Sequence, residues 1–378
     1  EGRRKAIAAR RKITRQYGSK AKAAALLGAT LASVEAPTRT ANYPPPPPAP
    51  PPPNSSPLSP PSPPPPGLPP APARPPPPPA GPWTLYTSAN DLKQAVDAWV
   101  ADEAAATAIH GHISGWDTSR VDDMSELFKS KTTFNTQLNW DTSKVTSMRY
   151  TFANAREFNR EVNGWDVASV TNMQYTFANA FDFNQQLDSW DTSKVTNMYQ
   201  MFADAEAFNA DIGGWDTSKV TSMQYTFRYA DAFNSELAWD TSSVTIMWNT
   251  FAYAKAFNQP LAWDTSKVTN LGGTFMNAEA FNQPLDWDTS SATTMQSLFA
   301  ITQFNQHIDS WDVTKVTVRS GMSGRAFHGM FQHTPFSNDE CKRQLTYASF
   351  SQQSDAFDLA YGCQAYGCQD WSSAVCPS

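Results

Sequence analysis

Three sets of side chains in this sequence carry groups that could do chemistry. Aspartate directly follows tryptophan nine times, at intervals of 24 or 25 residues, which would stack nine carboxylates in a column. Carboxylate oxygens are ligands that calcium prefers. Four cysteines between positions 341 and 376 could form disulfides or bind zinc. Five histidines are scattered between positions 110 and 333 and could serve as acids, bases or ligands.

The aspartate column favours a structural turn over a calcium site. In most repeats the aspartate is followed by Thr and then Ser, and the exceptions are Val167-Ala168 and Val313-Thr314. Asp and Ser side chains in such a run accept hydrogen bonds from nearby backbone N–H groups, as Asx and ST turns require. The column comprises Asp117, Asp141, Asp166, Asp191, Asp216, Asp240, Asp264, Asp288 and Asp312.

The cysteines favour disulfides. They are confined to the C-terminal segment, which indicates an oxidising compartment, and four cysteines allow three pairings. The intervening gaps of 21, 4 and 7 residues match no familiar spacing of zinc ligands. Reduced thiols and a metal site are the alternatives. The four residues are Cys341, Cys363, Cys368 and Cys376.

No pattern in the sequence indicates an enzyme. No histidine recurs beside a nucleophile in a recognisable motif, and no glycine-rich phosphate loop exists, so we expect no catalytic residue and no cofactor. Residues 83–378 carry eighteen Lys and Arg against thirty-three Asp and Glu, a balance that disfavours nucleic acid as a partner. No run of 18 apolar residues predicts a membrane-spanning helix.

A short repeat positions the tryptophans and aspartates. Phe-Asn recurs in phase with Trp-Asp, and between them runs Val-Thr-x-Met, then Phe four residues after the Met and Ala three residues later. A fixed period of this length indicates stacked supersecondary units that share one core. Blades of WD-repeat propellers need roughly 40–45 residues, so the Trp-Asp pairs do not mark a propeller. The tryptophans are Trp116, Trp140, Trp165, Trp190, Trp215, Trp239, Trp263, Trp287 and Trp311.

Each unit is long enough for one coil of a solenoid with rungs about 4.7–4.9 Å apart. The spacing of Met198, Phe202 and Ala205 places them on one face of a short helical segment. Trp190 and Val195 are expected to point inward from the more extended side of the coil. The predicted fold class is therefore an α/β repeat solenoid of short strands and short helical turns, in which each tryptophan fills one corner and the Phe-Asn asparagines form a hydrogen-bonding ladder.

The stretch "FNQQLDSWDTSKVTNMYQMF" at residues 183–202 resembles the repeat of the BspA-like leucine-rich-repeat surface proteins, and the resemblance covers about residues 83–336. It implies a leucine-rich-repeat-like fold and a cell-surface or secreted location. It also implies an adhesive or recognition role, and it brings no catalytic residues with it.

Composition divides the chain into five parts. Residues 1–43 form a basic, alanine-rich tail or targeting segment. Residues 44–82 contain 25 prolines, which predict a polyproline II stalk or linker. Residues 83–115 are the expected N-terminal helical cap, 116–336 the solenoid of about nine repeats, and 337–378 a cysteine-containing C-terminal cap. If the chain is secreted, the proline-rich segment would be a glycosylated stalk, and if it is cytosolic, a ligand for aromatic-lined grooves.

Capping segments are expected at both ends of the repeats, because an open coil exposes unpaired backbone groups. The first is a helix over residues 88–108, with Ser88 or Asn90 as its N-cap. The second is a helix that starts at Asn338 and follows a degenerate coil at Phe331 and Phe336.

The two positions after each repeated Met vary from coil to coil, so we expect specificity to lie there. Exposed aromatic, amide and Arg side chains favour contact with a protein or a glycan. The alternative is an aromatic ladder that only stacks along the solenoid. The sequence therefore predicts a non-enzymatic extracellular binding domain, for which the N-terminal region is a candidate wall or membrane attachment. The alternatives are a structural wall or matrix component and an accessory binding module. The candidate residues are Arg149, Tyr150, Gln174, Tyr175, Tyr199, Gln224, Tyr225 and Trp248.

Overall fold

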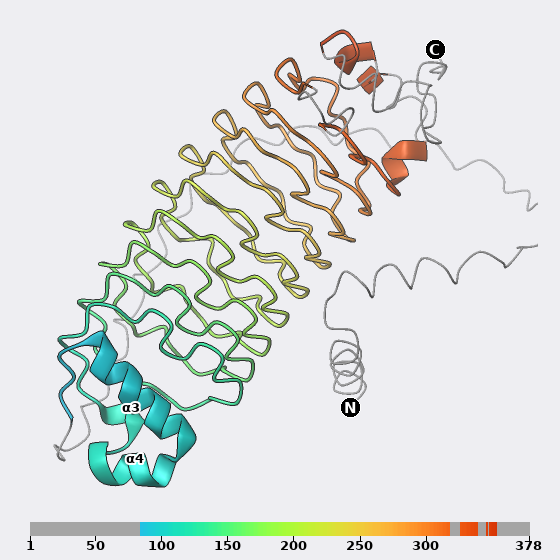
Figure 1. The fold of residues 1–378 in the computed structure, drawn as a ribbon. Coiled ribbons are helices and arrows are strands. Elements are labelled where there is room, and N and C mark those ends of the chain that lie inside the picture. Colours follow the sequence, from blue (N-terminus) through green and yellow to red (C-terminus); the bar gives the residue numbers. More distant parts are fainter. Residues whose placement is uncertain (1–83, 318–325, 339–344, 347, 354–378) are drawn as a thin grey trace, which may run out of the picture. The chain divides into compact units, whose positions relative to one another are not determined.

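The computed structural model describes residues 84–317, 326–338, 345–346 and 348–353, which all belong to one unit, Pro75–Ser378. Successive coils of the repeat lie side by side, and the helices α3 and α4 lie at the first coil (Figure 1). The helical elements of these residues that carry labels are α3 (Ala89–Ala101), α4 (Glu103–His110) and the 3-10 helices η1 (Ile113–Gly115) and η2 (Pro335–Asn338).

The helices α3 and α4 cover the first coil. The Ser88 side chain accepts a hydrogen bond from the Asp91 N–H and caps α3, and Asp102 ends α3 and caps α4. The buried face of α3 includes Trp99, whose ring lies 6.1 Å from the ring of Trp116 at an interplanar angle of 88°. This edge-to-face contact joins the cap to the first tryptophan of the repeat.

Backbone hydrogen bonds tie each coil to the next. From the repeated Met onward, alternate N–H groups donate to carbonyls of the following coil, as Met148 does to Asn172 (3.0 Å) and Phe152 to Thr176 (2.9 Å). The N–H groups between them turn back within the coil, as Thr151 does to Met148 (3.1 Å). Strand-like pairing in the described residues consists of isolated parallel bridges between neighbouring coils, and not of extended strands.

The segment after each Met differs from the short helical turn that the sequence predicts. In residues 198–205 the backbone has positive φ at Gln200 (54°) and Asp204 (59°), and the chain forms successive turns. An α-helix would direct these N–H groups to carbonyls within its own segment. Here alternate N–H groups donate to carbonyls of the next coil instead, and a helical backbone would not leave them free to do so. Met198, Phe202 and Ala205 are nevertheless all buried.

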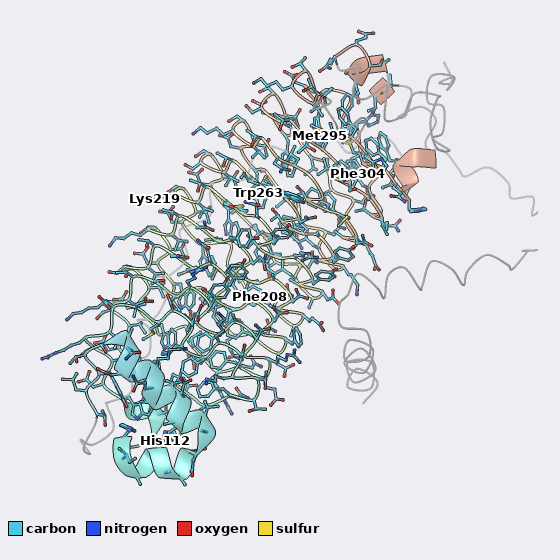
Figure 2. The ribbon with its side chains drawn as sticks, in the orientation of Figure 1. His112, Phe208, Lys219, Trp263, Met295 and Phe304 are labelled. Atoms are coloured by element: carbon cyan, nitrogen blue, oxygen red, sulfur yellow. The ribbon has the colours of Figure 1, made fainter. Side chains whose placement is uncertain are left out.

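The repeated tryptophans lie in the core, as the sequence predicts. Trp215 is 4% exposed and stacks between Trp190 and Trp239, with ring centroids 6.1 and 6.2 Å away. Its indole Nε1–H donates to the carbonyl of Leu187 in the preceding coil (3.0 Å). Figure 2 shows Trp263 of the same column among the packed side chains. From Trp140 to Trp311, each tryptophan of this column therefore fills a corner and donates to a backbone carbonyl 26 to 28 residues earlier in the chain.

The Asp-Thr-Ser run makes two kinds of hydrogen bond, one within its own turn and one to the next coil. Asp216 accepts a hydrogen bond at Oδ1 from the Ser218 N–H (3.0 Å), which confirms the predicted turn. Thr217 donates its Oγ1–H to the carbonyl of Asp240 in the next coil (2.8 Å). The asparagine ladder is also confirmed. From Asn135 to Asn282, Oδ1 of each Phe-Asn asparagine accepts a hydrogen bond from the backbone N–H of the Phe-Asn asparagine one coil later.

The predicted degenerate coil is present after the repeat. Phe331 stacks on Phe299 with ring centroids 6.1 Å apart, and Phe336 lies 6.3 Å from Phe304. Beyond it, Ser349 donates its Oγ–H to the carbonyl of Asp309 (2.7 Å). Most of the predicted C-terminal helix lies outside the described residues, as do all four cysteines and the whole of residues 1–82.

Candidate functional site

The candidate residues occupy two columns that run across the coils. The first column is the residue directly after the repeated Met, and the second column is the residue after that; Leu271 takes the place of Met in one coil. The aromatic residue changes column from one coil to another. In the coils from Met148 to Leu271, the first column holds Arg149, Gln174, Tyr199, Gln224, Trp248 and Gly272, and the second holds Tyr150, Tyr175, Gln200, Tyr225, Asn249 and Gly273.

The second column has a backbone that suits small or amide side chains. In these six coils its residues have φ between 54° and 62°, the left-handed region that Gly and Asn tolerate best. Asn249 and Gly273 fit this rule. Tyr150, Tyr175 and Tyr225 do not, because a bulky side chain in this region costs free energy. The sequence pattern does not indicate the left-handed backbone at this column, because the spacing of Met, Phe and Ala predicts a helical segment there.

The rings contact one another from coil to coil. Tyr150 and Tyr175 stack with centroids 4.2 Å apart and an interplanar angle of 15°. Tyr199 then lies 5.2 Å from Tyr175 at 59° and 5.7 Å from Tyr225 at 79°, and Trp248 lies 6.3 Å from Tyr225 at 30°. We call these five residues the aromatic strip. The rings are tilted where the aromatic residue changes column, so the strip is a broken ladder and not a uniform one.

Cations lie beside the strip. The Lys129 ammonium and the Arg149 guanidinium each lie 4.6 Å from the ring centroid of Tyr150. Arg228 lies 5.4 Å from the ring of Tyr225. Such contacts are attractive because the face of an aromatic ring is electronegative. The end of the strip at Tyr150 is therefore covered by two positive charges.

Burial raises the pKa of the Tyr175 phenol well above its ordinary value, and the neighbouring phenols of Tyr150 and Tyr199 raise it further. Like an ordinary tyrosine hydroxyl, that of Tyr175 is neutral at physiological pH and can both donate and accept hydrogen bonds. The side chains of the strip are half-buried, apart from that of Trp248, which is 45% exposed.

The strip ends at a groove with a volume of about 600 Å³, which Trp248 lines. In the next coil both columns hold glycine, Gly272 and Gly273, so no side chain follows Trp248. A Cβ atom on Gly273 would lie 2.2 Å from the side-chain amide of Asn249, so any other residue there would have to displace Asn249. The Gly-Gly pair in the sequence is the signal for this groove.

Asn249 holds the indole ring of Trp248 in place. With its amide oriented to satisfy both neighbours, the Asn249 oxygen accepts from the Trp248 Nε1–H and its nitrogen donates to the Gly273 carbonyl (3.3 Å). Asn249 is buried. The indole N–H is thereby used within the protein, and the ring offers its exposed surface to the groove.

The described part of the chain holds no cluster of three or more His, Cys, Asp or Glu residues that could bind a metal ion. None of its helices is both long and apolar enough to cross a bilayer. The predicted disulfide residues Cys341, Cys363, Cys368 and Cys376 lie outside it.

Comparison with known proteins identifies the repeat. The model of a family described as "Mycoplasma protein of unknown function, DUF285" matches residues 100–210, 162–261, 236–336 and 260–356. The four matches overlap, as expected for a tandem repeat, and together they cover more than half of the chain. No curated protein and no solved structure matches the sequence. The chain therefore belongs to the DUF285 family of repeat proteins.

Proposed function

We propose that the repeat is a non-enzymatic, extracellular binding domain that recognises a protein or a glycan through the aromatic strip. The resemblance to the BspA-like leucine-rich-repeat surface proteins supports this proposal. The coil-to-coil hydrogen bonding also supports a leucine-rich-repeat-like classification of the fold.

One observation carries the proposal: three tyrosines occupy left-handed backbone positions where the other coils use Glu, Gln, Asn, Gly or Ser. Tyr150, Tyr175 and Tyr225 all have φ between 58° and 60°, which disfavours bulky residues. Folding of the coil does not require an aromatic residue there, because the coils with Asn249 and Gly273 form the same backbone hydrogen bonds. A partner that needs these side chains is a reason to retain them.

The contacts within the strip define what a ligand can touch. Because Tyr150 and Tyr175 stack face to face, each covers one face of the other, and their half-buried side chains lie beside the exposed Arg149 and the half-buried Gln174. Aromatic and Arg side chains are enriched in protein interfaces, and Tyr hydroxyls and amides also suit the hydroxyls of sugars. The second candidate, a structural component, is favoured by the same ring stacking, since a ladder that only stabilises the coils would look alike.

The test is the replacement of Tyr150, Tyr175 and Tyr225 together by Ser in the full chain. We expect loss of binding on a glycan or surface-protein array and retention of the fold. Four lost ring contacts at about 0.5–1.5 kcal/mol each are partly offset, because Ser fits the left-handed backbone better. If the variant unfolds, the strip is a structural ladder. If it folds and binds at full affinity, the function lies elsewhere.

A further inference from the structure

We propose that two pairs of stacked tyrosines are modification sites, at which oxidation by a peroxide joins neighbouring coils through a carbon–carbon bond between two phenol rings. The pairs are Tyr150 with Tyr175, and Tyr229 with Tyr253. The proposal goes beyond the proposed function, because it concerns the reactivity of the phenols and needs no ligand. It starts from the repeat, which places side chains of equivalent positions next to one another in successive coils.

Both pairs occupy left-handed backbone positions. The first pair belongs to the second column. The second pair belongs to a third column, which is the residue six positions after the repeated Met, or after Leu271 in one coil. Tyr229 has a φ of 59° and Tyr253 a φ of 64°, where a bulky side chain costs free energy. In each column, tyrosine therefore occurs in two consecutive coils in spite of this cost. From Met124 to Met295, the other residues of the third column are Ser130, Asn154, Asn179, Asp204, Asn277 and Ile301.

The rings within each pair are close and nearly parallel. The centroids of Tyr150 and Tyr175 are 4.2 Å apart with an interplanar angle of 15°. Those of Tyr229 and Tyr253 are 4.3 Å apart with an angle of 17°. By contrast, the ring of Tyr199 is 5.2 Å from that of Tyr175 and tilted by 59°. The two pairs thus share one geometry although they lie in different columns.

The two hydroxyls of each pair lie side by side. Burial raises the pKa of the Tyr175 phenol most, and a hydrogen bond with the Tyr150 hydroxyl raises it further. Burial is also the largest cause of the raised pKa of Tyr253, followed by the charge of the Tyr229 phenol and a hydrogen bond with it. Parallel rings whose hydroxyls are at the same end also have their ortho carbons aligned, because each ortho carbon is bonded to the carbon that carries the hydroxyl.

Oxidation joins two such rings in a balanced reaction. The oxidant is hydrogen peroxide acting through a haem peroxidase, which removes one electron at a time. Each phenol loses one electron and its hydroxyl proton and becomes a neutral radical. The two radicals form a bond between ortho carbons, and the hydrogen on each of these carbons moves to the oxygen of its own ring. The pair has then lost two hydrogen atoms, and one peroxide molecule has taken them up to give two molecules of water.

The surroundings of the first pair direct the coupling to the partner ring. The Lys129 ammonium and the Arg149 guanidinium each lie 4.6 Å from the ring centroid of Tyr150. Lys129 belongs to the coil before Tyr150, and Tyr175 belongs to the coil after it. Saturated side chains of Lys and Arg form no phenoxyl radical, so a radical on Tyr150 has Tyr175 as its partner. All four tyrosines are half-buried, which limits contact with a ring of a second chain.

Each link would tie one coil to the next. Tyr150 and Tyr175 are 25 positions apart in the sequence, and Tyr229 and Tyr253 are 24 positions apart. A bond between such residues restricts the unfolded chain, as a disulfide across a loop of similar length does. Because coils of a repeat protein contact only their neighbours, a bond between neighbouring coils also opposes local separation of the stack.

The test identifies the linked residues directly. The full chain at low concentration is treated with hydrogen peroxide and a haem peroxidase, and the monomer is isolated and digested with trypsin, which cleaves after Lys and Arg. A Tyr150–Tyr175 link would join the peptide of residues 150–156 to that of residues 161–194. A Tyr229–Tyr253 link would lie within the peptide of residues 229–255, which would keep its two parts together after further cleavage at Glu236. We expect both linked products in mass spectrometry, each lacking two hydrogen atoms.

Replacement by Phe removes the phenol and keeps the ring. Tyr150→Phe should abolish the first link and leave the second, and Tyr253→Phe should do the reverse. The matched control is Tyr199→Phe, which should leave both links because the Tyr199 ring is tilted against its neighbour. The urea midpoint should rise on oxidation of the wild type and stay unchanged on oxidation of the double variant Tyr150→Phe, Tyr253→Phe.

Three outcomes would overturn the inference: the absence of either link, links that form only between chains, or a Tyr175–Tyr199 link as abundant as the Tyr150–Tyr175 link. An unchanged urea midpoint in the oxidised wild type would remove the stabilising role of the links. The Phe variants retain the rings of the aromatic strip, so their result bears on coupling of the phenols alone. Loss of a ligand in the Ser triple variant bears on the proposed function.

Discussion

Replacement of Trp215 by Ala measures how much the tryptophan column contributes to stability. The side chain is 4% exposed and stacks on Trp190 and Trp239 at angles of 7° and 2°. Truncation of a buried Trp costs about 3–5 kcal/mol. It also leaves the Leu187 carbonyl without the donor that now lies 3.0 Å away. An unpaired buried acceptor costs about 1–3 kcal/mol, so we expect the upper half of the first range, about 4–5 kcal/mol.

Urea unfolding of the full chain, followed by circular dichroism and by fluorescence, gives the free energy of unfolding. The two signals must coincide, because repeat arrays can unfold in parts. Trp215→Phe keeps a stacked ring but loses the indole donor, so an intermediate loss is expected. Trp248→Ala removes a Trp that is 45% exposed and contacts one ring, and should cost about 1 kcal/mol. A loss below about 0.5 kcal/mol for Trp215→Ala would refute the proposed packing.

Two further predictions concern the turns and the cysteines. The Ser218 hydroxyl, followed by the Ser218 N–H, holds the pKa of Asp216 below its ordinary value, and Ser266 does the same for Asp264. A lowered folded-state pKa stabilises the fold above the unfolded value of about 3.9, and this contribution is lost as pH falls through the folded pKa. The urea concentration at the unfolding midpoint should therefore decrease as the pH is lowered from about 5 to about 2. The decrease should be smaller in the double variant Asp216→Asn, Asp264→Asn, and an equal decrease in both proteins would contradict this prediction. We also expect Cys341, Cys363, Cys368 and Cys376 to be oxidised in protein from its native source, so four free thiols or stoichiometric zinc in non-reducing mass spectrometry would remove the support for secretion.

The periodicity of the sequence was sufficient to predict which residues form the core and the turns. A Trp that recurs every 24 or 25 residues is expected to be buried against the equivalent Trp of each neighbouring coil, and Trp215 is buried in this way. Asp-Thr-Ser has the chemistry of a turn in any context, because Asp216 and Ser218 are two residues apart and bond locally. Repeated Phe-Asn likewise predicts a ladder, since equivalent asparagines of stacked coils must be neighbours.

The backbone after each Met could not be predicted in this way. The spacing of Met198, Phe202 and Ala205 is the same for a helix and for the observed turns, and both bury the three side chains. The choice depends on where the N–H groups find acceptors. The carbonyls of the next coil supply them, and that coil is about 25 residues away in sequence. The resulting positive φ at Gln200 and Asp204 is a consequence of stacking.

The sequence by itself determined the period, the core columns, the turn chemistry and the two variable positions at which a ligand could bind. Only the tertiary structure decided that the rings of the strip tilt against one another and that a groove follows Trp248. Ring angles depend on which column each coil uses and on the distance between coils, which no single repeat specifies. The groove exists because Gly272 and Gly273 leave space between coils that fill it, and such space is a property of the stack.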